Sequence, residues 1–129
     1  MAETVVVFFR EDDGSVPSLE WLDGLHDKVQ NKFIVRIDRL VKCGHELRRP
    51  EADYLRDGIY ELRVRHMHVN YRLLYFFSSQ RAILSHGITK TDKVPATQID
   101  LAIDRLSKYE RNPQKYTYLE YEGRGGNYE

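Results

Sequence analysis

The residues best suited to chemistry lie in one stretch, residues 60–77, with the sequence YELRVRHMHVNYRLLYFF. Two runs typical of β-strands meet there at a short polar turn, which gathers three arginines and two histidines: Arg63, Arg65, Arg72, His66 and His68. A guanidinium group can bind phosphate through two parallel hydrogen bonds, and imidazole gains and loses a proton near neutral pH. The cluster therefore has the groups needed to bind an anion and to transfer protons.

The alternation of side chains along a strand decides which of these residues share a face. If the turn is centred on the Met-His pair, Arg63 lies opposite Arg72 and Arg65 lies opposite Asn70. Glu61 then lies on the same face of the hairpin. The other face is apolar and is expected to pack against helices; it contains Tyr60, Leu62, Val64, Tyr71, Leu73 and Tyr75.

The two opposed arginines call for a counter-charge. Like charges directly across a strand pair destabilise it by a fraction of a kcal/mol, and Glu61 is expected to offset only part of this effect for Arg63 and Arg72. Phosphate is a suitable counter-ion because guanidinium binds it in a bidentate manner. The alternative interpretation is a solvated row of arginines whose aliphatic stems lie over apolar neighbours.

Four other polar residues each have two interpretations. His66 and His68 have a spacing that can hold a metal on a strand, but no third ligand follows at a recognisable spacing, so no metal site is expected. They could act as acid–base groups beside the arginines or be exposed turn residues. Lys90 and Lys93, where the last strand gives way to a helix, could reach a ligand at the sheet edge or lie in a solvated loop. His86, within a predicted strand, is expected to be hydrogen-bonded and partly buried.

Charge is balanced over the whole chain but not along it. Lysine plus arginine and aspartate plus glutamate each number 20 in 129 residues, which excludes nucleic-acid binding by a bulk polycation but not by a local patch. Residues 56–93 have such a local excess, with seven lysines and arginines against three acidic residues.

The sequence also bears on cellular location. Cys43 is the single cysteine, so no internal disulfide can form and a cytoplasmic location is expected. No apolar run approaches the roughly 20 residues that a membrane-spanning helix needs. Residues 1–12 lack a basic region and a cleavage site, so we interpret them as a strand and not as a signal peptide.

Hydrophobic periodicity predicts one α+β domain at residues 1–112, with the order β-α-α-β-β-β-α and with helices mostly on one face of the sheet. We expect a first strand at residues 4–10 and two helices at residues 16–25 and 28–44. A polar loop at residues 45–58 leads to an antiparallel meander of three strands, at residues 59–65, 69–77 and 82–89. The last helix is expected at residues 95–112. The tail, residues 113–129, contains glycines and charges, and its last part is expected to be disordered.

Four segments together resemble the phage-derived HigB-like toxins of the RelE/ParE toxin superfamily. They are VPSLEWLDGL, GHELRRPEADYLRDGIYELRVR, NYRLLYFF and HGITKTDKVPATQIDLAIDRLSKY, and the resemblance runs from about residue 5 to residue 112. It implies the same β-α-α-β-β-β-α fold and the toxin of a type II toxin–antitoxin pair. Such toxins cleave mRNA, usually on the ribosome and without a metal or other cofactor, and leave a 2′,3′-cyclic phosphate and a 5′-hydroxyl. The implied partner is a HigA-like antitoxin with a helix-turn-helix domain.

The resemblance also implies roles for individual residues. Arg72, in YRLLY, corresponds to an arginine that stabilises the phosphate in the transition state, and Arg63 keeps a basic position of the YELR strand. Glu61 replaces a second basic residue there, and at Lys90 the chain has one lysine where related toxins often have two. The general acid and base are expected among Glu61, His66, His68 and Lys90, and substrate binding is expected to involve Arg65, Asn70 and Lys93.

Two further functions fit the same residues. The replacement at Glu61 and the missing second lysine favour a non-catalytic module that binds RNA or an acidic protein segment with the same patch. A ParE-like inhibitor of DNA gyrase on the same fold is the third possibility, and it would act on DNA topology instead of mRNA.

Overall fold

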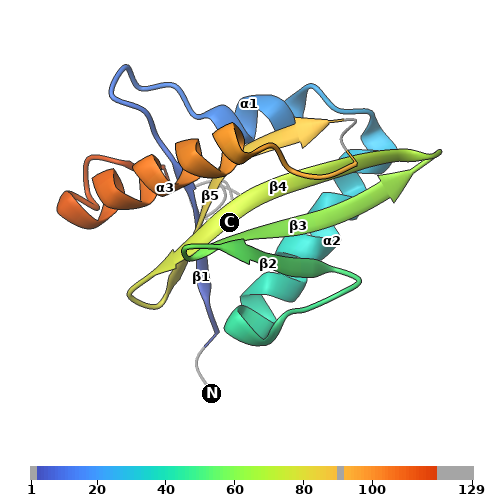
Figure 1. Ribbon diagram of the computed structural model, residues 1–129, viewed down its shortest axis with the longest axis horizontal. Coiled ribbons are helices and arrows are strands. Elements are labelled where there is room, and N and C mark those ends of the chain that lie inside the picture. The colour runs from blue at the N-terminus through green and yellow to red at the C-terminus, as the bar shows by residue number, and fades with distance from the viewer. Residues whose placement is uncertain (1–2, 90–91, 119–129) are drawn as a thin grey trace, which may run out of the picture.

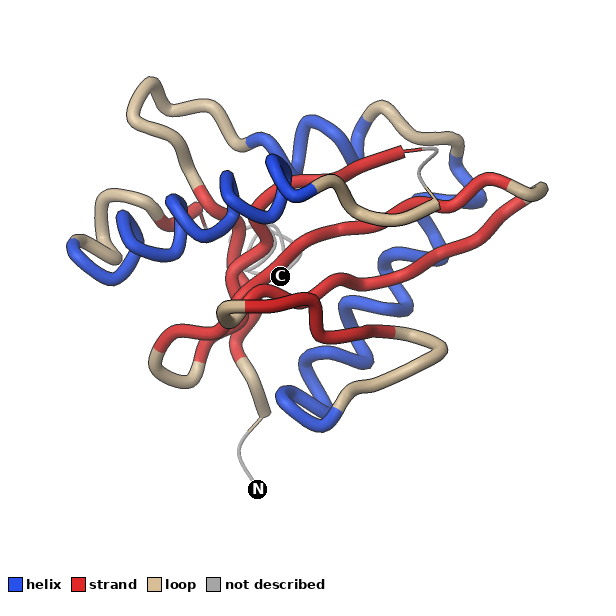
Figure 2. The backbone as a smooth tube through the Cα atoms, viewed as in Figure 1, coloured by secondary structure: helices blue, strands red, loops and turns tan. Residues whose placement is uncertain are grey.

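The computed structural model describes residues 3–89 and 92–118, whose strands form one mixed sheet (Figures 1 and 2). In chain order the elements are β1 (Val5–Phe9), α1 (Pro17–Asp23), α2 (Asp27–Cys43), the 3-10 helix η1 (Gly44–Glu46), β2 (Ala52–Arg56), β3 (Ile59–His66), β4 (Val69–Ser78), β5 (Arg81–Thr89), α3 (Ala96–Arg111) and β6 (Thr117–Tyr118). The strand order is β2-β3-β4-β5-β1-β6. Strands β2 to β5 form an antiparallel meander, and β1 is parallel to β5. The α+β class and the predicted order of the main elements are confirmed.

The β3–β4 hairpin has the predicted register. Arg63 pairs with Arg72, and Arg65 pairs with Asn70. The two turn residues, Met67 and His68, have positive φ angles of 50° and 67°. Positive φ at both central residues is typical of a type I′ turn, whose twist matches that of the flanking strands although asparagine and glycine adopt it more readily. An unusual turn sequence thus gives a common hairpin geometry.

Helices cover both faces of the sheet, so the prediction that they lie mostly on one face is wrong. The helices α1 and α2 pack on one face, where Phe33 and Leu73 belong to the same core, and α3 packs on the other, with Ile99 and Phe76 (Figure 1). Residues 73–76 of β4 are all buried, because a strand that is covered on both faces needs no polar alternation. An unbroken apolar run lacks the alternation of polar and apolar residues that would show which face of the strand is covered, and this is why the prediction of one covered face failed.

Residues 52–56 form β2 where the sequence indicated a loop, so that part of the loop prediction is also wrong. β2 pairs antiparallel with β3, through Ala52 opposite Leu62 and Tyr54 opposite Tyr60. It is an edge strand, and such strands often contain polar and charged residues that face solvent. A polar sequence is therefore compatible with a strand at this position.

The chain after α3 returns to the sheet. β6 pairs with β1, and the ring of Tyr116 stacks on that of Phe9 with 5.4 Å between their centroids. The Tyr116 hydroxyl also donates a hydrogen bond to Asp12. Residues 113–118 thus pack on the domain, whereas the disorder expected for the end of the tail concerns residues outside the described part. No described helix is long and apolar enough to cross a membrane.

Trp21 packs α1 directly against β5. A Cβ atom at Gly87 would lie 1.9 Å from the indole ring, so that this residue of β5 must be glycine for the ring to lie where it does. The indole Nε1 donates a hydrogen bond to Thr89 Oγ1 over 3.1 Å, and the ring meets Phe33 of α2 edge-on at 5.3 Å. The indole is therefore fixed by a strand on one side and a helix on the other.

We expect Gly87→Ala to lower the free energy of unfolding by about 1–3 kcal/mol, because the added methyl group must displace the indole. Chemical denaturation followed by the fluorescence of Trp21, the single tryptophan of the chain, measures the change. Gly24→Ala is the matched control, since a Cβ atom there would have only ordinary contacts at 3.7 Å. An unchanged midpoint for Gly87→Ala would contradict this account of the α1–β5 contact.

Candidate functional site

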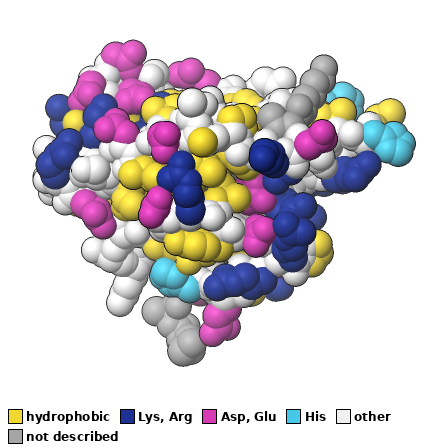
Figure 3. Space-filling model, in the orientation of Figure 1, with side chains coloured by type: hydrophobic (Ala, Val, Ile, Leu, Met, Phe, Trp, Pro, Cys, Tyr) yellow, Lys and Arg dark blue, Asp and Glu magenta, His cyan; other side chains and the backbone are white. Residues whose placement is uncertain are grey.

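The polar face of the β3–β4 hairpin is the candidate site. On this face α3 packs over Phe76 and its apolar neighbours, while the part nearer the turn contains Glu61, Arg63 and Arg72. Figure 3 shows a group of lysine and arginine side chains on the right of the view, over β3 and β4. The predicted arginines Arg63, Arg65 and Arg72 thus lie toward the end of the sheet that extends beyond the core under α3.

Glu61 and Arg72 form a buried ion pair at the inner boundary of this region. Their relative exposures are 1% and 8%. Arg72 Nη1 donates to both carboxylate oxygens of Glu61, over 2.8 and 3.0 Å, and its Nη2 donates to the carbonyl of Asp92 over 2.7 Å. The guanidinium therefore ties two strands to the segment that leads into α3.

Glu61 supplies more of the counter-charge than the sequence suggested. Its carboxylate contacts Arg72 directly and lies 3.9 Å from Arg63 Nε. On the unforeseen strand β2, Asp53 adds a second carboxylate, 3.9 Å from Arg63 Nη1. The two opposed arginines are thus stabilised within the protein and do not need a bound anion to coexist.

Arg63 is the arginine of the pair that solvent can reach, with 28% of its side chain exposed. Its buried Nη1 has no hydrogen-bond partner among the described residues, because both nearby carboxylates are too distant. Its backbone NH donates to Glu51 and its carbonyl accepts from Arg36 Nε. Arg63 and Arg72 therefore form a non-hydrogen-bonded strand pair, in which side chains lie closest together.

The other predicted residues lie farther from the ion pair. Arg65 and His68 are exposed near the turn, Asn70 is half-buried, and Lys93 is exposed in the loop before α3. Lys90 lies outside the described residues. Of the substrate-binding candidates, Arg65 and Asn70 extend the arginine face toward the hairpin tip.

His66 points to the opposite face of the sheet. Its Nδ1 lies 3.1 Å from Lys32 Nζ, and its ring stacks on that of His26 with 6.3 Å between centroids. Partial burial, followed by the charge of Lys32, lowers the pKa of His66 below its usual value. The hairpin thus brings Glu61, Arg63 and Arg72 together and separates His66 from them.

Comparison with known proteins identifies the family. The family model described as phage derived protein Gp49-like (DUF891) matches residues 20–107, which is more than half of the chain. The chain belongs to this Gp49-like family. The matched range contains all the candidate site residues, from Glu61 to Lys93. No curated protein matches the chain.

A buried polar network holds α3 on the sheet of this Gp49-like protein. Arg105 is 6% exposed and donates to Glu11 and to the carbonyl of Ser85. His86 lies between Ser85 Oγ, at 2.8 Å, and Gln98 Oε1, at 3.0 Å, so its expected burial and hydrogen bonding are confirmed. The role of Arg105 was not predicted from the sequence. Gln98 and Arg105 lie seven positions apart on one face of a helix, and this spacing could have indicated that both contact the same partner.

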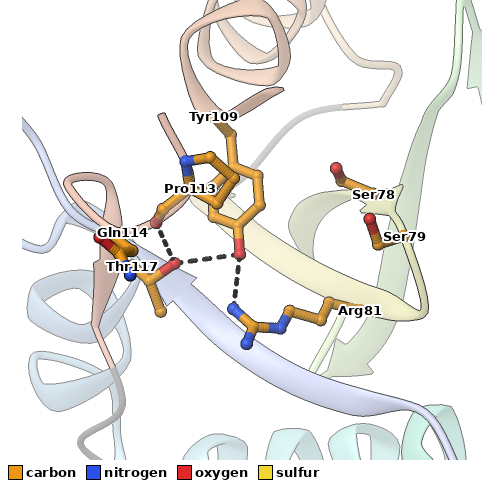
Figure 4. Close-up of a pocket in the computed structure, with 7 residues that line it drawn as sticks. All are labelled: Ser78, Ser79, Arg81, Tyr109, Pro113, Gln114 and Thr117. Carbon is orange, nitrogen blue, oxygen red and sulfur yellow. Dashed lines mark hydrogen bonds between the residues drawn. The ribbon is translucent and has the colours of Figure 1, made fainter. Parts of the chain in front are cut away.

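A pocket of about 470 Å³ lies at the far end of β4 from the arginine face (Figure 4). Its lining residues are Ser78, Ser79, Arg81, Tyr109, Pro113, Gln114 and Thr117. Arg81 Nη1 donates to the Tyr109 hydroxyl over 3.1 Å, which occupies one edge of the guanidinium. Within the described ranges, no group of three or more His, Cys, Asp or Glu residues could hold a metal ion.

Glu61→Ala should lower the free energy of unfolding by about 3–5 kcal/mol, because Arg72 would remain buried without its carboxylate. The double variant Glu61→Leu/Arg72→Met should regain most of this loss, since an apolar pair of similar volume needs no ion pairing. Chemical denaturation measures both. Asp38→Ala, which breaks the exposed pair with Lys42, is the control and should cost under about 1 kcal/mol. A double variant no more stable than Glu61→Ala would contradict the prediction.

His86 should make stability depend on pH. Burial, and then the charge of Arg105, lower its pKa from 6.5 to about 4. The folded state keeps the ring neutral where the unfolded chain already binds a proton, so stability is full above about pH 6.5 and falls as the pH drops toward 4. The loss should approach about 3 kcal/mol.

Denaturation at a series of pH values tests this. His86→Gln should remove much of the decline below pH 6.5, because glutamine does not titrate. Equal slopes for the parent chain and His86→Gln would show that other groups cause the decline.

Proposed function

We propose that the protein is a HigB-like toxin of the RelE/ParE superfamily, a metal-independent endoribonuclease that cleaves mRNA on the ribosome and is neutralised by a HigA-like helix-turn-helix antitoxin. Three findings support this proposal: the resemblance of its sequence segments, its Gp49-like family and the matching order of elements. The observation that carries it is the cationic end of a sheet face, where the partly exposed Arg63 lies opposite the buried Arg72.

The proposed reaction is an intramolecular transesterification. The 2′-hydroxyl of a ribose loses its proton to a base, and its oxygen forms a bond to the adjacent phosphorus. The bond from phosphorus to the 5′-oxygen breaks, and that oxygen takes a proton. The products are a 2′,3′-cyclic phosphate and a 5′-hydroxyl, and negative charge accumulates on the phosphoryl oxygens in between.

Arg63 is the residue placed to meet that charge. Its guanidinium is partly exposed, with 28% of the side chain accessible to solvent. A preorganised donor directed at a developing anion typically accelerates a reaction by about 10²–10³-fold. Arg72 adds positive charge across the hairpin, and Glu61 acts as the positioning residue that orients Arg72.

Proton transfer in this proposal involves residues around the arginines. The carboxylate of Glu61 is already engaged by Arg72 through both oxygens, so it is held away from the 2′-hydroxyl of a bound RNA. The remaining candidates are His68, at the hairpin turn, and Lys90, which follows Thr89 in the sequence and lies outside the described residues. Reliance on residues outside the ion pair fits an enzyme that depends on the ribosome to orient its substrate.

A non-catalytic binding module is the second candidate function. The internal ion pair favours it, because Glu61 occupies donors of Arg72 that a phosphate would otherwise use. Such a module would bind RNA through Arg63 and Arg65 and leave it intact.

Arg63→Ala should lower mRNA cleavage by about 100-fold or more and abolish growth arrest, with little change in the midpoint of thermal unfolding. Arg63→Lys should retain part of the activity, because it keeps the charge but not the planar donors. The assay is cleavage of ribosome-bound mRNA in the presence of a chelator, with analysis of the RNA ends. Arg111→Ala, on the exposed end of α3, is the control and should cleave normally.

Full cleavage by Arg63→Ala would remove Arg63 from the site. Salt-dependent RNA binding by the parent chain without any cleavage would favour the binding module. Arg63 is a sharper test than Arg72, because truncation of Arg72 would leave the buried Glu61 unpaired and destabilise the fold.

A further inference from the structure

The outer edge of β3 is free of strand pairing near the hairpin turn. Pairing with β2 runs as far as Leu62, and Arg63 N makes one more hydrogen bond to the carbonyl of Glu51 over 2.9 Å. Beyond this point two side chains of α2 bind the edge carbonyls. Arg36 Nε donates to Arg63 O over 2.9 Å, and Lys32 Nζ donates to Arg65 O over 3.4 Å. Cationic side chains, and not a further strand, therefore cover this edge.

The same positive charge continues onto the opposite face. Lys32 also contacts His66, whose ring stacks on His26. His26 caps α2 by accepting a hydrogen bond from the backbone NH of Lys28. Partial burial and Lys32 lower the pKa of His66 most, and the exposed Lys28 side chain is near enough for its charge to add to this effect. We call this set the cationic band: Arg63 and Arg65 on the polar face, Arg36 and Lys32 at the edge, and Lys28 on the α2 face, with His66 and His26 beside them.

Among the described residues, four members of the cationic band have no ion pair, whereas Arg63 lies 3.9 Å from the carboxylates of Asp53 and Glu61. Six other surface lysines and arginines of the described residues are paired, in Arg39–Glu51, Lys42–Asp38, Arg49–Asp53, Arg56–Asp100, Lys108–Asp104 and Lys115–Asp12. Five more have no ion pair within the described ranges but are scattered over the chain: Arg10, Arg48, Arg81, Lys93 and Arg111. In the band, Lys28, Lys32, Arg36 and Arg65 have no ion pair with any described residue, and Asp27 is the acidic neighbour in the first turn of α2. Their charges are available to an anionic partner.

We propose that single-stranded RNA leaves the arginine face across the free edge of β3 and follows the cationic band onto the α2 face. The proposal rests on the proposed function, which places a phosphate at Arg63, and it extends the RNA path beyond that phosphate. From Arg36 to Lys28 the helix advances by about 12 Å, which makes the band longer than one phosphate group. A track of unpaired cations that begins at the scissile phosphate favours a nucleic-acid backbone over an acidic protein segment.

The test measures binding without cleavage. Fluorescence anisotropy at several salt concentrations would compare 2′-O-methyl RNA of about 4 and about 12 nucleotides, which span typical site sizes. For the long RNA, Lys28→Gln/Lys32→Gln should reduce the slope of log affinity against log salt by about 1.4, because each lost contact to a single strand contributes about 0.7. The short RNA should bind the parent chain and the variant alike.

Controls separate the band from general effects. Lys42→Gln lies on the same helix but removes a lysine paired with Asp38, so it should leave both affinity and slope nearly unchanged. Lys28→Gln alone keeps the test valid if loss of Lys32 weakens the fold, because the Lys28 side chain has no hydrogen bond or ion pair with the described residues. It should reduce the slope by about 0.7.

Each outcome bears on one proposal. Parent-like slopes for Lys28→Gln and the double variant on long RNA would overturn the RNA path, as would band-dependent binding of an acidic peptide without binding of RNA. Band-dependent binding of long RNA, together with failure to cleave ordinary mRNA, would support the path and refute the nuclease.

Discussion

The buried carboxylate of Glu61 is the charge on which the polar end of the sheet depends. It contacts Arg72 across the hairpin and lies near Arg63, so two arginines can face each other at the border of a dry core. Through Arg72 it also links the hairpin to the segment before α3, at Asp92. In a poorly solvated site such charges interact strongly, and removal of Glu61 or Arg72 leaves the other buried without its partner. Fold stability and the orientation of the cationic surface therefore depend on the same contact.

The coverage of the sheet decides where that surface can lie. The residues at the centre of β4 are buried on both faces, by α1 and α2 on one side and by α3 on the other. At the hairpin end, where α3 gives way to the loop at residues 92–95, the sheet presents polar side chains to solvent. A rigid, apolar platform thus supports a short cationic tip, which is the arrangement that preorganised phosphate binding requires.

Different parts of this arrangement were visible in the sequence to different degrees. The register that opposes Arg63 and Arg72 could be predicted, because the alternation of side chains along a strand is fixed once the turn is located. β2 could not be predicted, because the sequence of a polar edge strand resembles that of a loop. Asp53 lies on β2, so the position of its carboxylate was missed as well. The sequence also did not determine which arginine Glu61 contacts. The alternation of side chains along a strand assigns each residue to a face of the sheet but does not say which neighbour its side chain will bind. The Arg105 network depends on contacts between segments far apart in the chain.

The position of β1 has a consequence for synthesis. This strand lies inside the sheet between β5 and β6, and Val5 pairs with Arg81. During translation the apolar β1 emerges long before the strand that it must join, and such distant contacts form slowly. The arginine face also needs Asp92, which is made later still. A nascent chain therefore cannot assemble this surface until nearly the whole domain has left the ribosome.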